Sequence, residues 1–336
     1  MHHLITGANG FVMSVLAARI LATDPEARIT AIDLRLPDES VLRHLGGAAA
    51  ERTRFLAVDV TDAEAVSHAV AEARPDTVVH GATVTHDARS EVEAPARFTG
   101  VNVEGTVHVL DAARRLTSPP TVVLVSSGAV YGSSPQTLLT EASAPCPDEL
   151  YGISKWAAEL VARRFAELHG LPTTVVRLTK MFGPMERPTG GRAVMSLPYH
   201  LAAAAVQGRP ARLTARTLDA GGDWLSAQSA AAALHAAARR PPAPGTVATF
   251  NVSSGRWTSV RELVAAFGVD VVETPVDAAD ADMDPADGYG KNGVYACDRA
   301  RSELGWTPGD LGAQVAEHLA WARAHPDLFE HTGGPA

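Results

Sequence analysis

The first 33 residues constrain the fold of this chain more than any other part of it. An apolar run at 3–6 leads into the glycine-containing turn 7–10, and residues 11–22 have the pattern of an amphipathic helix. A second apolar run at 28–32 ends in Asp33. Strand, glycine turn, helix, strand and acid, in this order, form the first unit of a doubly wound parallel sheet. The sequence therefore predicts an α/β fold of the Rossmann type.

The glycine turn of such a unit serves to bind a dinucleotide. Glycines let the backbone approach a pyrophosphate, which lies at the positive N-terminus of the helix. An acid at the end of the second strand accepts hydrogen bonds from the adenosine ribose and repels a 2′-phosphate. Asp33 therefore favours NAD over NADP as the cofactor, while Arg35 weakens that preference. The alternative is a turn that only connects strand to helix.

Strand and helix patterns alternate through the first half of the chain. Uninterrupted apolar runs are typical of parallel strands that are covered on both faces. Beyond Leu178 the pattern loosens into loops that contain Pro and Gly. We expect 1–180 to form an NAD-binding Rossmann domain to which 223–255 returns, and 181–222 with 256–336 to form a smaller C-terminal substrate-binding region. Predicted strands lie at 55–58, 77–80, 121–125, 173–178 and 247–252, and predicted helices at 63–73, 101–116 and 226–240.

Composition and charge exclude several classes of protein. A chain of 336 residues, 46% of them hydrophobic, can bury a large core. The net charge of -9 opposes non-specific binding to nucleic acid. Cys146 and Cys297 form no metal-binding pattern and give no reason to expect a disulfide. No apolar stretch approaches the ~20 residues of a membrane span, and Met1 leads into a strand without room for a signal peptide. We therefore expect a cytoplasmic protein without a metal site and with neither nucleic acid nor membrane as a partner.

Tyr151 and Lys155 carry the strongest chemical signal in the sequence. Their four-residue spacing places both side chains on one face of a helix, one turn apart. A phenol with its ordinary pKa of about 10 is a poor base at neutral pH. A neighbouring ammonium group favours the phenolate, so the pair suits proton transfer to or from an alcohol. The alternative is an ordinary pair on the surface of a helix.

Polar residues at the ends of the predicted strands point to one shared cleft. Asp33, Asp59, His80 and Ser127 each stand at the carboxyl end of an apolar run, and Tyr151 begins the helix after the strand that carries Ser127. In open parallel sheets ligands bind at that edge. The sequence therefore predicts that these side chains face one binding site.

Several motifs together resemble the extended short-chain dehydrogenase/reductases, in the NAD-dependent epimerase/dehydratase group that includes UDP-glucose 4-epimerase-like sugar epimerases. The resemblance covers nearly the whole chain. It implies a carbohydrate-like small-molecule substrate, NAD, and a homodimer formed through a helix pair that includes the helix of Tyr151. The motifs are 6–12, 59–60, 80–82, 102–106, 126–132, 151–155, 250–255 and 298–306.

The resemblance also implies roles for individual residues. Ser127 would hold the reacting hydroxyl or ketone, and Tyr151 would exchange its proton. Lys155 would lower the pKa of Tyr151 and bind the nicotinamide ribose. For His80, a hydrogen bond within the fold is an equal alternative to a cofactor contact. The expected cofactor-binding residues are Gly7, Gly10, Phe11 and Val12 at the pyrophosphate, Asp33 at the ribose, Asp59 and Val60 at the adenine, His80, Gly81 and Ala82 in the groove with Asn102 nearby, and Tyr151 and Lys155.

The chain departs from the family pattern around the cofactor and the catalytic serine. Met13 stands where the family has its third glycine, so its side chain must turn aside or push the turn outward. Gly128 and Ala129 follow Ser127 where sugar-nucleotide dehydratases of the family carry an acid. Neither side chain transfers a proton, which argues against dehydration.

The substrate side departs as well. Lys180 replaces an Asn, and Gly222 replaces the Arg that precedes the Asp-Trp pair. A second Arg is missing, because Lys291 is the only basic residue between Arg261 and Arg299. These changes imply a differently held diphosphate or a substrate without one, since arginine pairs well with phosphate. The candidate substrate residues are Thr85, Ser127, Lys180, Arg187, Arg192 and Lys291, and the alternative for the four basic ones is a solvated surface position.

Three functions fit these observations. The first is an NAD-dependent epimerase of a sugar or sugar nucleotide that acts through a transient ketone. The second is an NAD-dependent dehydrogenase of a polyol, sugar or hydroxy acid that lacks a nucleotide. The third is a non-catalytic NAD-binding protein, against which the complete set of Ser127, Tyr151 and Lys155 counts.

Overall fold

The centre of the molecule is a seven-stranded parallel sheet with the strand order β12-β7-β5-β4-β1-β2-β3. The computed structural model describes residues 1–134, 137–275 and 293–329. The chain begins in the middle of the sheet, adds strands on one side, and then crosses to the other side of β1. This arrangement confirms the predicted doubly wound α/β fold of the Rossmann type. The sheet strands are β1 (His2–Thr6), β2 (Arg28–Asp33), β3 (Thr53–Ala57), β4 (Thr77–His80), β5 (Thr121–Ser127), β7 (Thr173–Leu178) and β12 (Val247–Val252).

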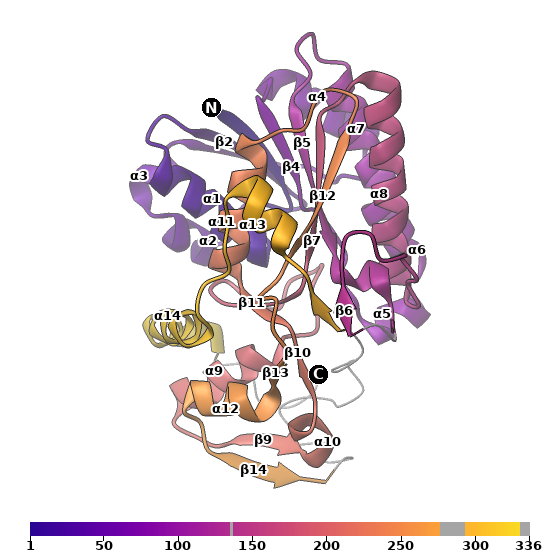
Figure 1. Ribbon diagram of the computed structural model, residues 1–336. Coiled ribbons are helices and arrows are strands. Elements are labelled where there is room, and N and C mark those ends of the chain that lie inside the picture. Colours follow the sequence, from indigo (N-terminus) through magenta and orange to yellow (C-terminus); the bar gives the residue numbers. More distant parts are fainter. Residues whose placement is uncertain (135–136, 276–292, 330–336) are drawn as a thin grey trace.

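Helices cover both faces of the sheet (Figure 1). On one face α1 (Phe11–Thr23) packs against α11 (Ala227–Arg239). Most of α1 is apolar and buried, so it is a core helix and not the amphipathic helix that its composition suggests. On the other face lie α4 (Ala63–Ala73), α7 (Gly105–Arg114) and α8 (Leu150–His169). The sheet is therefore dry on both sides, as its continuous apolar strands require.

Segment 223–255 returns to the sheet after a long excursion. It contributes α11 to one face and β12 to the edge, where Val252 pairs with Leu178 of β7. The later helix α13 (Asp298–Leu304) lies against β12 and α11.

A second apolar core lies beyond the carboxyl edge of the sheet. It is built by α9 (Leu197–Gln207), α12 (Val260–Phe267) and α14 (Leu311–Ala324), with the parallel pair β9 (Ala211–Thr214) and β14 (Val271–Thr274) beside them (Figure 1). Phe182 and Trp224 are fully buried in this core. They sit on β8 (Lys180–Phe182) and β11 (Trp224–Ser226), which pair in parallel just past the main sheet.

The remaining elements are short and connect these layers. They are α2 (Glu39–Leu45), α3 (Gly47–Ala50), α5 (Ala88–Glu93), α6 (Ala96–Thr99), the π-helical η1 (Gly100–Glu104), η2 (Gly128–Tyr131), β6 (Leu138–Leu139), α10 (Ala215–Leu218), β10 (Gly221–Gly222), β13 (Thr258–Ser259), β15 (Val294–Tyr295) and η3 (Pro326–Phe329). Across the three described ranges, no helix is both long and apolar enough to cross a membrane.

Candidate active site

A cavity of about 960 Å³ opens at the carboxyl ends of the parallel strands. Its wall is formed by the glycine turn before α1, by the ends of β2, β4 and β5, by the start of α8, and by the loop 188–196. A doubly wound sheet binds its ligand at this edge, where the strand order reverses. The cavity therefore lies where the sequence predicts the binding site.

The structure brings Ser127, Tyr151 and Lys155 together in this cavity. Ser127 ends β5, and its side chain shares a hydrogen bond with the hydroxyl of Tyr151 on α8. Lys155, one helical turn further, is almost fully buried and donates from Nζ to the carbonyl oxygen of Val125 at 2.5 Å. A hydroxyl, a phenol and an ammonium group thus line one cavity on two neighbouring elements.

Burial shifts the acidity of both titratable groups. It raises the pKa of Tyr151, against which the hydrogen bond from Ser127 and the charge of Arg192 act. It lowers the pKa of Lys155 to about 8, against the opposing charge of Glu159. The Lys155 ammonium is directed at a backbone carbonyl of β5. That Lys155 lowers the pKa of Tyr151 stays a prediction from the sequence.

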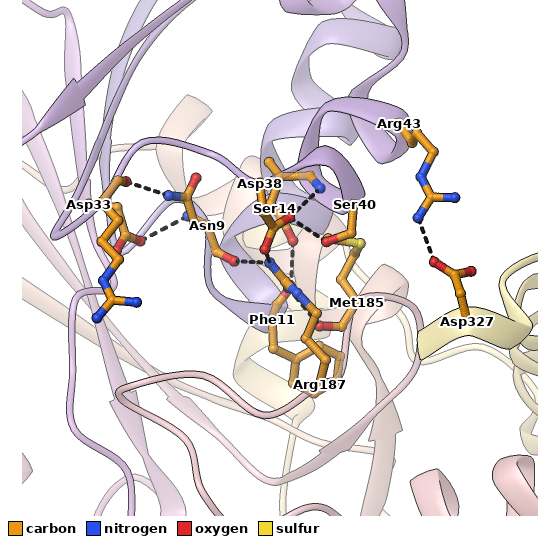
Figure 2. Close-up of polar contacts among 12 residues, drawn as sticks. Asn9, Phe11, Ser14, Asp33, Asp38, Ser40, Arg43, Met185, Arg187 and Asp327 are labelled. Carbon is orange, nitrogen blue, oxygen red and sulfur yellow. Dashed lines mark hydrogen bonds and ion pairs between the residues drawn. The ribbon is translucent and has the colours of Figure 1, made fainter. Parts of the chain in front are cut away.

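The glycine turn has the shape of a dinucleotide cradle. Gly7 has a φ of +68°, and a Cβ there would lie 2.8 Å from the backbone of Ala82. Gly10 donates its N–H to the carbonyl of Gly7, which closes the turn. Asp33 accepts the backbone N–H of Asn9 at 2.9 Å and that of Leu34 at 2.8 Å, and burial raises the pKa of its carboxyl group. Figure 2 shows Asp33 beside Asn9 at this turn. These residues fit NAD, because the backbone of the glycine turn can approach a pyrophosphate and the acid can bind a ribose.

Met13 is accommodated by a glycine at the neighbouring strand end. Its side chain is buried and lies directly against Gly81, so that any Cβ at position 81 would meet the thioether. The side chain has turned toward the end of β4, where a glycine leaves room for it. Met13 still contributes to the cavity wall.

The remaining predicted cofactor residues divide into two groups. Phe11, Val12, Asp59, Val60, Gly81 and Ala82 line the cavity. His80 and Asn102 do not line it, so for His80 the structure favours the alternative of a hydrogen bond within the fold over a cofactor contact.

The reason is that both side chains are held by hydrogen bonds within the fold. Nδ1 of His80 lies 2.7 Å from the hydroxyl of Thr6, and Nε2 lies 3.0 Å from that of Thr106. Burial lowers the pKa of His80 to about 3. The amide of Asn102 bonds to both backbone groups of Val84 and donates to Ser154 of α8.

Arg187 is also turned away from the cavity, which corrects its prediction as a substrate residue. Its guanidinium donates to the Asp38 carboxylate at 3.0 Å and to the backbone carbonyls of Asn9 and Met185 (Figure 2). The side chain is buried. It therefore ties the glycine turn to the loop after β8.

Of the other predicted substrate residues, Thr85, Lys180 and Arg192 line the cavity. Thr85 donates through its hydroxyl and its backbone N–H to the carbonyl of Gly191, which fastens the loop 188–196. Lys291 lies outside the described residues.

Lys180 and Arg192 bring positive charge to the cavity wall. A Cβ at position 222 would lie 2.8 Å from the Lys180 side chain, so Gly222 makes the space that Lys180 uses. Arg192 lies over the Phe11 ring at 5.3 Å and pairs with the fully buried Glu186 at 2.5 Å. Both cations are thus positioned by specific neighbours.

Three further cavity residues escaped the sequence analysis. Nδ1 of His86 and Oε2 of Glu149 lie 3.1 Å apart in the wall of the cavity that holds Tyr151. Tyr295 of β15 packs against Gly128, where a Cβ would lie 2.5 Å from its hydroxyl. The sequence holds one signal for these contacts, which is the absence of a side chain at position 128 where the resembling family has an acid.

Comparison with known proteins identifies similar sequences. The model of the family described as "NAD dependent epimerase/dehydratase family" matches residues 3–253. The chain is 30% identical to a dTDP-glucose 4,6-dehydratase of Streptomyces antibioticus over 352 aligned positions, covering 100% of this chain and 98% of that protein. It is 29% identical to a UDP-glucose 4-epimerase of Mycolicibacterium smegmatis, covering 92% of this chain and 94% of that protein.

The fold is similar to that of solved sugar-nucleotide epimerases. The structure of UDP-glucose 4-epimerase from Thermotoga maritima with UDP-glucose superposes with a TM-score of 0.81 at 20% identity. The match covers 97% of this chain and 100% of that one. At this identity the match establishes the fold alone.

Proposed function

The chain belongs to the NAD dependent epimerase/dehydratase family, and from this premise we propose that it is an NAD-dependent epimerase of a sugar nucleotide. It is an enzyme of the extended short-chain type, with NAD as its cofactor. The observation that carries the proposal is the cavity in which Ser127 and Tyr151 share a hydrogen bond, while Gly128 and Ala129 follow without an acid.

The reaction requires a proton to move between a substrate hydroxyl and the protein. NAD, when bound, accepts hydride from the substrate carbon and returns it. Tyr151 takes the hydroxyl proton as the ketone forms and gives it back when the alcohol is restored. Ser127 orients the reacting oxygen beside Tyr151. Lys155 is anchored on the backbone of β5 and brings positive charge to the same cavity.

Further residues are assigned by where they lie in the cavity wall. We assign Gly7, Gly10, Phe11 and Val12 to the pyrophosphate of NAD, Asp33 to its adenosine ribose, and Asp59 and Val60 to the adenine. The substrate would lie between α8 and the second core, so we assign 181–222 and the region after 255 to substrate binding.

The diphosphate of the substrate requires cations, which Lys180 and Arg192 supply in this proposal. Both line the cavity, and Gly222 leaves Lys180 the space that an arginine at position 222 would fill. Relatives with full-length similarity act on nucleotide sugars by their names, which supports a substrate of this class.

A homodimer formed through α8 is also proposed. Large apolar side chains on this helix are exposed, among them Ile153 at 45%, Leu160 at 47% and Leu168 at 57%. A second copy of α8 would cover this surface.

The two cysteines are free thiols, in keeping with the cytoplasmic location predicted from the sequence.

The first test is the NAD content of the purified protein and its action on UDP-glucose, UDP-galactose and dTDP-glucose, followed by NMR. An epimerase that keeps its cofactor through turnover should release about one NAD per chain on denaturation and interconvert two epimers without net NADH. Loss of water from dTDP-glucose would instead identify a dehydratase. Accumulation of NADH with a non-nucleotide alcohol would identify the alternative dehydrogenase.

Tyr151→Phe tests the residue assignment. Removal of the hydroxyl should lower turnover by about 10²–10⁴-fold while NAD content stays near that of the wild type, since the group acts in proton transfer. Activity retained at more than a few per cent would contradict the role of Tyr151.

A further inference from the structure

One pair of titratable side chains in the cavity has no part in the hydride transfer proposed for Tyr151. Oε2 of Glu149 lies 3.1 Å from Nδ1 of His86. Both residues line the cavity that holds Ser127 and Tyr151. His86 comes from the segment after β4, and Glu149 stands two residues before Tyr151 at the start of α8. The pair and the catalytic phenol therefore line one cavity, and Glu149 and Tyr151 come from the same end of α8.

The local structure explains why Glu149 faces His86. A short polar side chain at the N-cap position, such as that of Asp or Ser, ordinarily accepts the first N–H groups of its helix. Glu149 is the N-cap of α8 but makes no such bond. The N–H of Leu150 is instead satisfied by Glu91 of α5, at 2.8 Å. Because Glu91 caps the helix, the Glu149 carboxylate reaches His86 in the cavity wall.

The two residues after Ser127 carry no proton-transfer side chain of their own. Gly128 has none, and the Tyr295 ring fills the space that one would occupy. Ala129 offers only a methyl group. Any second acid–base group for the substrate would therefore come from another element.

We propose that Glu149, paired with His86, exchanges the proton on the substrate carbon beside the ketone. This inference rests on the proposed function, because it requires a keto sugar in the cavity. The Glu149 carboxylate takes the proton, and the electron pair of the C–H bond forms the C=C bond of an enolate. The carbonyl oxygen takes up the charge and accepts hydrogen bonds from Ser127 and Tyr151. Return of a proton from Glu149 to the same carbon restores the ketone, so no oxidant or reductant is consumed.

His86 connects Glu149 with solvent in this scheme. Its side chain is 29% exposed, and that of Glu149 is 25% exposed. An imidazole exchanges protons through either ring nitrogen, so His86 can pass the proton of Glu149 to water. Because Glu149 takes its proton from a carbon beside the ketone, the substrate class is a keto sugar nucleotide with a C–H bond next to its carbonyl.

The experiment supplies the ketone directly, so that exchange is measured apart from hydride transfer. The full-length protein is incubated in D₂O with UDP-4-keto-6-deoxy-D-glucose or its dTDP counterpart, and deuterium in the sugar is followed by NMR and mass spectrometry. The wild type should incorporate deuterium at a carbon beside the ketone well above the enzyme-free rate. Glu149→Gln should lower the exchange rate by at least about 100-fold, and His86→Asn by a smaller factor.

Glu91→Gln is the matched control, because Glu91 touches the same helix end but does not line the cavity. Its exchange rate should stay near that of the wild type. An equal loss in Glu91→Gln would show that helix position matters and not the carboxylate, which would overturn the proposal. Absence of exchange above the enzyme-free rate with either probe would also overturn it. The epimerisation assay on UDP-glucose tests the proposed function separately. Epimerisation without deuterium exchange leaves the proposed function standing and overturns only the role of Glu149, whereas absence of both reactions overturns both.

Discussion

A buried ion pair beneath the catalytic helix should dominate the stability of this region. Arg177 of β7 donates to the carboxylate of Glu159 on α8 through Nε at 3.0 Å and Nη2 at 2.7 Å. It also donates to the hydroxyl of Tyr131 at 2.8 Å, and Ser126 donates to Glu159 at 2.5 Å. Both charged side chains are only 3% exposed. The pair therefore joins α8, one turn beyond Lys155, to two strands of the sheet.

Arg177→Met tests this arrangement. The substitution leaves the Glu159 carboxylate buried with Ser126 as its one remaining donor among those above. Removing one partner of a buried pair costs about 3–5 kcal/mol, because the other charge stays desolvated. The lost bond to Tyr131 adds about 1 kcal/mol. We expect a decrease of about 4–6 kcal/mol in the free energy of unfolding.

Urea-induced unfolding followed by circular dichroism measures this loss. The double variant Glu159→Gln, Arg177→Met removes both charges and should regain at least about 2 kcal/mol relative to Arg177→Met. Arg164→Met, which breaks the exposed pair of Arg164 with Glu167 on the same helix, should cost no more than about 1 kcal/mol. A loss below about 1 kcal/mol in Arg177→Met, or no recovery in the double variant, would refute the reasoning.

Three further outcomes follow from the cavity. The pKa of Lys155 is lowered to about 8, so its buried charge costs stability below that pH. The free energy of unfolding of the NAD-free wild type, relative to that of Lys155→Met, should therefore rise by about 3 kcal/mol as the pH increases from about 8 to about 10. A flat difference in urea titrations would contradict this. Gly81→Ala should push Met13 into the cavity and weaken NAD binding in calorimetry by about tenfold, and Met13→Gly in the same chain should restore it. Lys180→Met should raise KM for UDP-sugars by about tenfold with a smaller change in kcat, and equal effects on both would contradict a role in holding the diphosphate.

Local sequence pattern was sufficient to predict the sheet and the meeting of Ser127 with Tyr151. The strands are continuous apolar runs, and a parallel sheet brings their carboxyl ends to one edge whatever the details of packing. Tyr151 begins the helix that follows the strand of Ser127, so topology alone places the two side chains near each other. These inferences depend on backbone direction, which the pattern specifies.

The sequence does not specify the direction of single side chains. His80 stands at the end of β4, as expected, but its ring lies between Thr6 and Thr106, residues from two other elements. Arg187 is held by Asp38, which lies far from it in the sequence. The pair of His86 and Glu149 was missed for the same reason. A side chain turns toward the partner that satisfies it, and the sequence does not say which distant residue that is.

The departures from the family pattern become interpretable only in pairs. Met13 taken alone suggests a disturbed glycine turn, yet Gly81 leaves the space in which its thioether is buried. Gly222 taken alone suggests a lost cation, yet the Lys180 side chain crosses the position that an arginine side chain would occupy. In both cases a glycine leaves the space that a larger residue on another segment fills, and at positions 180 and 222 the positive charge has moved to a new backbone position. The single substitution Gly222→Arg should therefore fail to restore a family-like phosphate site, because Lys180 already occupies its volume, whereas Gly222→Arg with Lys180→Asn should bind UDP in calorimetry. Tighter UDP binding by the single variant than by the double variant would show that the two positions act independently.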